Sequence, residues 1–273
     1  MFLVFDIGGT NMRVAVSSDK KEISNSKIIP TPKDFDKGIQ AFKQIADQLG
    51  GEPIKGVSGG IAGPLDSEKT MLLASPHISN WVQKPLKDKL EKVFNCPVSL
   101  ENDTALVGLG EALKGSGVGY PIVAYITVST GVGGVRIVEG KIDENALGFE
   151  PGHQIIVPDG NPCNCGGKGH LEAYVGGSYI EKIYGQKAEN LKDPKIWDEI
   201  SKYLAIGLNN TIVHWSPDAI VLGGSVIKSL PLNKLEQHLS QTLTIFTKHP
   251  PIKPATLGHN AGFYGAFTFL PFS

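Results

Sequence analysis

Two glycine-rich turns, each between apolar segments of strand length, constrain the fold of this chain more than any other feature. The first turn is Asp6-Ile7-Gly8-Gly9-Thr10-Asn11, and strand-like residues lie on both sides of it. Paired glycines permit positive φ and a close approach of ligand to backbone, and successive turn N–H groups can bind an anion. Asp6, at the end of a buried strand, is placed to hold a metal ion through water. An ordinary hairpin turn explains this stretch equally well.

The second turn repeats that plan. An apolar segment at 125–128 leads into Ser129-Thr130-Gly131-Val132-Gly133-Gly134, and apolar residues follow. Neither turn is a Walker A loop, which needs a lysine before a helix, and neither is a dinucleotide-binding turn, because strand rather than helix follows. One such turn near the start of each half indicates two related lobes that face each other across a phosphate.

Composition excludes several classes of protein. The net charge is -1 and the only arginines are Arg13 and Arg136, so no basic stripe points to nucleic acid. No apolar run approaches the ~20 residues that span a bilayer, and the first residues lack the basic flank of a signal peptide. Three cysteines, an odd number, do not suggest a disulfide framework. Reduced thiols with a metal role, in a cytoplasmic protein, fit better.

Strand and helix patterns alternate along the chain, which predicts the α/β class. Helical spacing or composition predicts helices at 32–49, 85–94, about 104–113, 171–184, 197–213, 232–243 and 262–270. Short apolar runs predict strands before several of these helices, at 54–57, 98–100 and 219–222. The glycine-rich segment 115–119 is the best linker. We therefore expect a small N-terminal α/β lobe at 1–114 and a larger α/β lobe with a metal loop at 115–261.

Asn102-Asp103 lies at a predicted strand-to-helix junction. The helix N-terminus would keep a carboxylate ionised there, by an effect of ~0.3–1 kcal/mol. Such a carboxylate suits the acceptance of a sugar hydroxyl proton in phosphoryl transfer. The alternative is helix capping, for which both residue types are favoured.

A loop between 143 and 170 has little periodicity but carries two thiols and two imidazoles. The candidate ligands are His153, Cys163, Cys165 and His170. Together they can complete a tetrahedral zinc shell with no open position, which describes a structural zinc site. Reduced cysteines in a turn are the alternative. Glu150 and Glu172 flank this loop and could point at a polyol.

Two further glycine-rich turns follow predicted strands. One contains Gly60. The other is Gly223-Gly224-Ser225, where a helix is expected to start and a base or ribose could lie over bare backbone. Plain connecting turns are the alternative for both.

Taken together, these motifs resemble the ROK family (repressor, open reading frame, kinase). Glu150-Pro151-Gly152-His153 and the segment from Cys163 to Glu172 are the most specific of them, and the motifs span nearly the whole chain in family order. The resemblance implies a two-lobed actin-like (ribonuclease H-like) sugar kinase fold with a central cleft. It also implies that the last helix, about 262–273, returns to the first lobe.

The resemblance assigns roles to single residues. Asp103 would be the catalytic base, with magnesium positioned by Asp6. The expected sugar contacts are Gly60, Asn80, Asn102, Asp103, Glu150, His153 and Glu172. The expected ATP contacts are Gly8, Gly9, Thr10, Asn11, Thr130, Gly131 and Gly133 for the phosphates, and Gly223 and Gly224 for the adenosine. His170 departs from the family, which usually has a cysteine there, but histidine is an equally good zinc ligand.

The implied activity is glucokinase-like: ATP phosphorylates a hexose hydroxyl, giving a sugar 6-phosphate. Glucose is the first choice, and N-acetylmannosamine, N-acetylglucosamine or fructose are the alternatives. Such kinases are usually homodimers. A repressor of the family would carry an N-terminal helix-turn-helix, for which the hairpin beginning at Phe2 leaves no room. A non-catalytic sugar-binding relative would have lost Asp103, which is present.

Overall fold

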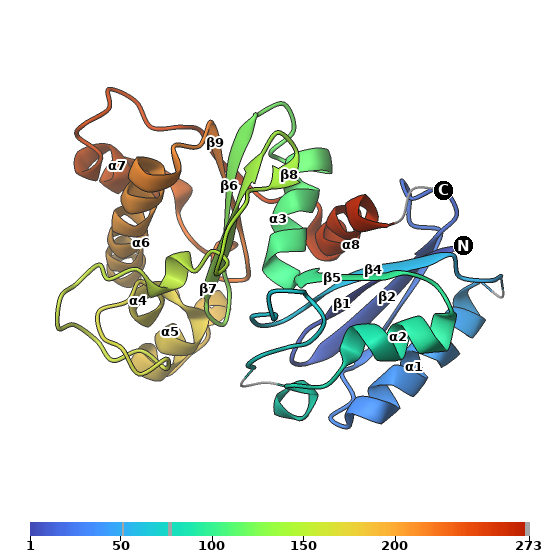
Figure 1. Ribbon diagram of the computed structural model, residues 1–273. Helices are drawn as coiled ribbons and strands as arrows, with labels where there is room; N and C mark the ends of the chain where they lie inside the picture. Colours follow the sequence, from blue (N-terminus) through green and yellow to red (C-terminus); the bar gives the residue numbers. More distant parts are fainter. Residues whose placement is uncertain (51, 76–77, 271–273) are drawn as a thin grey trace. The chain divides into compact units, whose positions relative to one another are not determined.

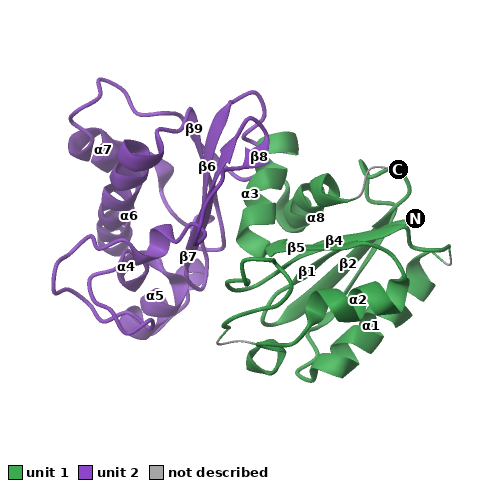
Figure 2. Ribbon diagram, viewed as in Figure 1, with its two compact units in different colours: residues 1–114, 257–273 green, residues 115–256 purple. Residues whose placement is uncertain are grey.

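The computed structural model describes residues 1–50, 52–75 and 78–270, and the chain forms two compact units (Figure 2). Unit 1 comprises residues 1–114 and 257–273, and unit 2 comprises residues 115–256. The last three residues of the expected C-terminal helix, 271–273, lie outside the described residues. The chain leaves unit 1 at the glycine-rich segment predicted as a linker and re-enters it before the last helix.

Unit 1 contains a five-stranded sheet in the order β3-β2-β1-β4-β5 (Figure 1). Strands β1 (Phe2–Ile7), β2 (Asn11–Ser17) and β3 (Asn25–Pro30) form an antiparallel meander. Strands β4 (Gly56–Ile61) and β5 (Val98–Asn102) continue the sheet parallel to β1.

Helices cover both faces of this sheet (Figure 1). Leu3, Phe5 and Ile7 pack with residues of α1 (Phe35–Leu49) and α2 (Leu86–Phe94) on one face. Phe2 and Val4 pack on the other face, with residues of α3 (Asp103–Lys114) and α8 (Ala261–Ala266). Side chains of a strand alternate between faces, so Asp6 belongs to the face that α3 and α8 cover.

Unit 2 contains a second five-stranded sheet, in the order β10-β9-β6-β7-β8. The strands are β6 (Ile122–Val128), β7 (Val132–Val138), β8 (Lys141–Ile142), β9 (Ala219–Gly223) and β10 (Ile252–Pro254). Four helices pack on one of its faces, namely α4 (Glu172–Val175), α5 (Gly177–Tyr184), α6 (Pro194–Trp215) and α7 (Leu232–Thr242). Short 3₁₀ turns occur at Ser79–Trp81 (η1), Pro151–His153 (η2), Ala188–Asn190 (η3), Gly258–Asn260 (η4) and Phe267–Phe269 (η5).

The predicted α/β class is confirmed, and the differences from the expected elements have local causes. The expected helix at 171–184 is two helices, because Gly176 adopts extended angles between them. The chain after Gly224 forms turns rather than a helix, since Gly224 has φ +97° and Val226 N donates to Val128 O. Strand β3 was not expected, because its residues are mostly exposed and lack an apolar pattern. Within the described residues, no helix is long and apolar enough to cross a membrane.

Candidate functional site

The β1–β2 turn of unit 1 presents backbone to solvent. Gly9 and Thr10 are exposed, and Gly8 N donates to Asn11 O across the turn at 2.9 Å. Thr31, just after β3, holds the turn from the side. Its Oγ1 donates to Gly8 O at 2.7 Å and its backbone N donates to Thr10 O at 2.9 Å. Sequence reasoning missed Thr31, whose contact depends on the unexpected strand β3.

Asp6 is bound by an arginine on the neighbouring strand. Asp6 and Arg13 lie directly opposite each other on β1 and β2, and Arg13 Nη1 donates to Asp6 Oδ2 at 2.6 Å. Burial raises the pKa of Asp6, and the Arg13 guanidinium opposes that shift. The ion pair therefore favours the ionised carboxylate in a poorly solvated position.

Asn102 and Asp103 divide the two roles that the sequence left open. Asn102 caps α3, because its Oδ1 accepts from Ala105 N at 3.1 Å, and its Nδ2 donates to Gly63 O at 3.2 Å. Asp103 Oδ1 accepts a bond from the next residue, at 2.7 Å from Thr104 N. Capping therefore falls to Asn102, which leaves the Asp103 carboxylate available for chemistry.

The environment of Asp103 changes its acidity. Burial is the main cause that raises the pKa of Asp103, to about 6, and the nearby Asp6 raises it further. A carboxyl with a pKa of about 6 is roughly nine-tenths ionised at pH 7. Asp103 can therefore accept a proton at neutral pH and is a stronger base than an ordinary aspartate.

Gly60 allows the N-terminus of α3 to approach the sheet. A Cβ on Gly60 would lie 2.8 Å from Asp103 Cα and 3.3 Å from Asp103 Cβ. No side chain fits in that space, so the absence of a side chain at position 60 allows Asp103 to lie over strand β4. Its expected sugar contact stays a prediction.

Glu101 and Lys69 form an ion pair that sequence reasoning missed. Glu101 is buried beside the Asn102-Asp103 turn, and it accepts from Asn102 N at 2.9 Å and from Lys69 Nζ. Lys69 has φ +52° and follows a tight turn, since its N donates to Asp66 O. No local sequence signal joins these two residues, because a loop brings them together.

Asn80 lies in the 3₁₀ turn η1, beside buried Trp81. Trp81 Nε1 donates to Pro32 O at 2.9 Å, which anchors the turn to the start of the α1 region. Asn80 is exposed and lines a surface hollow of about 470 Å³ with residues that include Asp34, Phe35 and Lys84. The described residues that line this hollow do not include Asp103. The expected sugar contact of Asn80 therefore stays a prediction.

The β6–β7 turn of unit 2 is held from two sides. Gly177 N donates to Ser129 O at 2.6 Å, and Ser178 donates to Thr130 O from both its N and its Oγ. On the other side, Glu172 Oε2 accepts from Val132 N at 2.9 Å. A Cβ on Gly131 would lie 2.3 Å from Glu172 Oε2, so the glycine is needed for this contact. Glu172, which is expected to contact the sugar, thus contacts the turn that is expected to bind the ATP phosphates.

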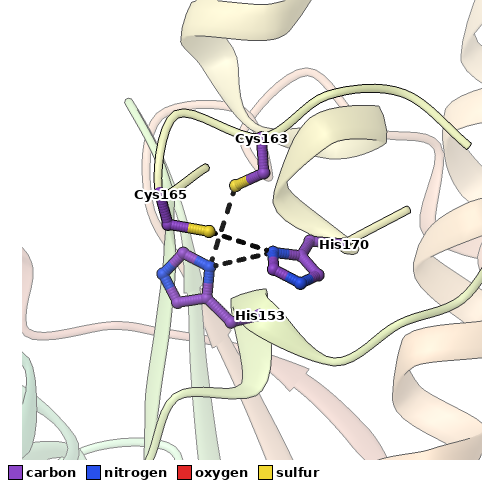
Figure 3. Close-up of side chains that lie close together, drawn as sticks. All are labelled: His153, Cys163, Cys165 and His170. Carbon is purple, nitrogen blue, oxygen red and sulfur yellow. Dashed lines mark hydrogen bonds between the residues drawn. The ribbon is translucent and has the colours of Figure 1, made fainter. Parts of the chain in front are cut away.

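The metal loop brings its four expected ligands together (Figure 3). All four ligand atoms lie within 4.8 Å of one another. His153 Nδ1 lies 3.4 Å from His170 Nδ1 and 3.8 Å from Cys163 Sγ, and Cys165 Sγ lies 3.3 Å from His170 Nδ1. Tetrahedral zinc, with bonds of about 2.3 Å to sulfur and 2.0–2.1 Å to nitrogen, separates neighbouring ligand atoms by about 3.3–3.8 Å. The four side chains therefore fit a zinc ion.

Glycines shape this loop. Gly166 has φ +94° and its N donates to Cys163 O, which turns the chain between the two cysteines. Cys163 N in turn donates to Gly167 O at 2.8 Å. A Cβ on Gly167 would lie 2.5 Å from the His170 ring, so this position also requires glycine.

The other nitrogen of His153 points at a carboxylate. His153 Nε2 lies 4.0 Å from Glu150 Oε2, on the opposite side of the ring from the metal ligand atom Nδ1. Burial raises the pKa of Glu150, His153 lowers it, and Glu172 raises it. Glu150, His153 and Glu172 are therefore neighbours in unit 2, as the sequence hypothesis requires.

Gly223, the last residue of β9, and Gly224, which follows it, have a packing role. A Cβ on Gly223 would lie 2.2 Å from Tyr125 Oη, and one on Gly224 would lie 2.1 Å from Val128 O. Both glycines thus allow close approach to strand β6. Their expected contact with adenosine stays a prediction.

Two α/β units, each built on a five-stranded sheet with a glycine-rich hairpin turn, place the chain in the class of actin-like α/β proteins. The chain belongs to the ROK family, whose model matches residues 3–271. The predicted family and fold are thereby confirmed.

Two relatives and two solved structures illustrate the similarity. The chain is 29% identical to a glucokinase of Halalkalibacterium halodurans, over 95% of this chain and 92% of the relative. It is 30% identical to an N-acetyl-D-glucosamine kinase of Haemophilus influenzae, over 97% and 98%. A ROK hexokinase from Thermus thermophilus superimposes with a TM-score of 0.88 at 29% identity, over 98% and 97%. A ROK glucokinase from Streptomyces griseus, solved with glucose and AMPPNP, gives 0.81 at 27% identity, over 98% of each chain.

Proposed function

We propose that this protein is an ATP-dependent sugar kinase that phosphorylates a hexose hydroxyl, with glucose as the preferred substrate. The observation that carries the proposal is the Asp103 carboxylate. It lies at a helix N-terminus, is not used as the cap, and has its pKa raised to about 6. The glucokinase relative and the glucose- and AMPPNP-bound glucokinase structure support the same activity.

In this proposal Asp103 accepts the hydroxyl proton of the sugar as the sugar oxygen attacks the γ-phosphorus of ATP. The bond from that phosphorus to the β–γ bridging oxygen breaks, and ADP leaves with the electron pair. Catalysis of this kind depends mainly on positioning and charge neutralisation, which is why a single base is sufficient. The elevated pKa of Asp103 brings its basicity closer to the working pH.

The phosphates of ATP are proposed to bind the exposed backbone of the β1–β2 turn and the glycines of the β6–β7 turn. Magnesium, when bound, would neutralise phosphate charge. Asp6 fits as its protein partner, because the bond from Arg13 occupies one acceptor position of a carboxylate that has about four.

The proposed sugar contacts in unit 2 are Glu150, His153 and Glu172, and those in unit 1 are Gly60, Asn80, Asn102 and Asp103. Charged and polar groups discriminate strongly against sugars that lack the matching hydroxyl. The N-acetyl-D-glucosamine kinase relative makes N-acetylglucosamine the second candidate. N-acetylmannosamine and fructose remain further alternatives.

We also propose a structural zinc ion at His153, Cys163, Cys165 and His170. The ligand separations support it, and four protein ligands leave no position for a reacting water. The zinc ion would order a polar loop and so orient His153 and Glu172. A homodimer in the cytoplasm is part of the same hypothesis.

The test is a coupled assay of ADP release with ATP and magnesium over a panel of glucose, mannose, fructose, N-acetylglucosamine and N-acetylmannosamine. We expect glucose to give the highest kcat/KM. Turnover of an N-acetylated sugar with none of glucose would reject the substrate, and no turnover of any sugar would reject the kinase.

A further inference from the structure

A tyrosine of helix α5 contacts the loop that carries the two cysteines. Tyr179 Oη donates to Pro162 O at 2.8 Å, and Pro162 immediately precedes Cys163. Tyr179 is 4% exposed and Cys163 is 6% exposed, and both pack in one small cluster with Ala173. Burial is the main cause that raises the pKa of Tyr179, and the Cys163 thiol raises it further, so the thiol lies beside the hydroxyl.

The four proposed zinc ligands come from separate segments of the chain (Figure 3). His153 ends the 3₁₀ turn η2, and His170 lies two residues before α4. Cys163 and Cys165 lie in the loop between them. The bond from Cys163 N to Gly167 O closes this loop on itself and does not tie it to a helix. A contact from a helix therefore helps to fix the cysteine pair relative to the two histidines.

Two tyrosines supply such contacts. Tyr174 Oη, on α4, accepts from Asn161 N at 2.8 Å, and Asn161 Nδ2 donates to Ala173 O at 3.3 Å. These bonds hold the start of the loop. The bond from Tyr179 lies one residue from Cys163 and holds the cysteine end. Loss of the Tyr179 hydroxyl alone would leave the start of the loop anchored and release the cysteine end.

We propose that Tyr179 is a positioning residue for the zinc ion. Its hydroxyl keeps Cys163 in the ligand arrangement before the ion binds, and this preorganisation sets how tightly zinc is retained. The proposal rests on the structural zinc ion proposed above and is independent of which sugar the protein phosphorylates.

The physical reason is the free energy needed to order a loop. Metal binding is coupled to folding of the segment that supplies the ligands, so any disorder in the zinc-free loop lowers the affinity. If only a fraction of the zinc-free molecules has the ligands in place, the apparent affinity falls by that fraction. The bond from Tyr179 to Pro162 O raises this fraction, since it stabilises the arrangement in which Cys163 faces the other ligands.

Tyr179→Phe removes the hydroxyl and keeps the ring in its buried cluster. Loss of one hydrogen bond corresponds to roughly 2–10-fold in an equilibrium constant, and loss of a group that supports a metal ligand to about 10–100-fold in metal affinity. We expect the variant to bind zinc about tenfold more weakly than the wild type, where the two ranges meet. The measurement is a titration of the full-length protein with zinc in competition with a chromophoric chelator.

Tyr184→Phe is the matched control. Tyr184 lies on the same helix, α5, and its hydroxyl faces Glu199 of α6 rather than the metal loop. The substitution removes the same chemical group, so a general loosening of α5 would follow from either variant. The zinc affinity of Tyr184→Phe should equal that of the wild type.

Urea denaturation of the zinc-free protein separates a positioning role from a purely structural one. If Tyr179 only stabilised the packing of α5, Tyr179→Phe would lower the stability of the zinc-free protein and leave zinc affinity unchanged. That result would overturn the proposal. Under the proposal the zinc affinity itself falls, whatever the change in the stability of the zinc-free protein.

The zinc titrations of the three proteins decide the question. About tenfold weaker binding in Tyr179→Phe, with wild-type binding in Tyr184→Phe, supports the proposal. Equal affinity of Tyr179→Phe and the wild type, or an equal loss in Tyr184→Phe, overturns the role of Tyr179 and leaves the zinc site standing. A wild-type protein that binds no zinc rejects both. None of these measurements needs turnover, so a failure of the kinase function would not change their outcome.

Discussion

Replacing Gly60 by alanine tests whether the close approach of α3 to strand β4 positions Asp103. The new Cβ would lie 2.8 Å from Asp103 Cα, and its contacts with Asp103 Cβ and N would be 3.3 Å. Carbon atoms pack at about 3.5–4.0 Å, so the start of α3 must move by roughly 0.7 Å or more. The atoms in the way belong to or adjoin the backbone and cannot rotate aside.

This displacement has two expected consequences. Overpacking of this kind costs about 1–3 kcal/mol of folding free energy. A misplacement near 1 Å of a group that takes part in chemistry can cost about 10²-fold in rate. We therefore expect Gly60→Ala to lower kcat for glucose phosphorylation by roughly 10–100-fold, with the protein still folded at 25 °C.

Gly59→Ala is the matched control, because Gly59 faces the other side of the same strand. Its added Cβ would lie 2.4 Å from the Phe5 ring, in the core shared with α1 and α2. That variant should lose as much stability or more, yet it should retain most of its kcat per folded molecule. Both quantities follow from urea denaturation and from initial rates. Wild-type kcat in Gly60→Ala, or an equal loss of kcat in Gly59→Ala, would refute the reasoning.

Two further predictions concern the metal loop and the acidity of Asp103. Protein purified without added metal should contain about one equivalent of zinc. The His170→Cys variant should retain the zinc, and the His170→Ala variant should lose it. Less than about a tenth of an equivalent of zinc in fully active wild-type protein would reject the site. The pKa of Asp103 in the folded protein is raised to about 6 from 3.8, so the native state binds this proton more tightly than the unfolded chain does. The contribution of Asp103 to the free energy of unfolding therefore falls as the pH rises from about 4 to 6. Asp103→Asn should therefore stabilise the protein at pH 7.5, by roughly 1–3 kcal/mol, and much less at pH 4. Urea denaturation at the two pH values checks this, and an equal effect at both would contradict the raised pKa.

Much of the fold was predictable because its signals are local. Apolar strands beside glycine-rich turns predicted the β1–β2 and β6–β7 hairpins, and helical spacing predicted α1 and α2. Strand β3 gave no such signal, since its pairing with β2 stabilises a mostly exposed segment. Gly176 divides a segment whose spacing alone suggested one helix.

The candidate sites show the same division. The ligands His153, Cys163, Cys165 and His170 were predictable, because they lie close together in one loop of a recognisable type. The pairs Arg13–Asp6 and Lys69–Glu101 were not, because they depend on strand register and on a loop that returns to the sheet. The bond from Val132 N to Glu172 likewise joins two segments that only the folded chain brings together.

The most direct test of the central claim is the turnover of Asp103→Asn with glucose and ATP, measured beside glucose binding by calorimetry. Asparagine keeps the shape and can still accept the bond from Thr104 N, but it cannot accept the proton of a hydroxyl. The account predicts that kcat falls by about 10²–10⁴-fold while glucose affinity stays within a few-fold of wild type. A variant that phosphorylates glucose at nearly the wild-type rate would contradict the assignment of Asp103 as the base.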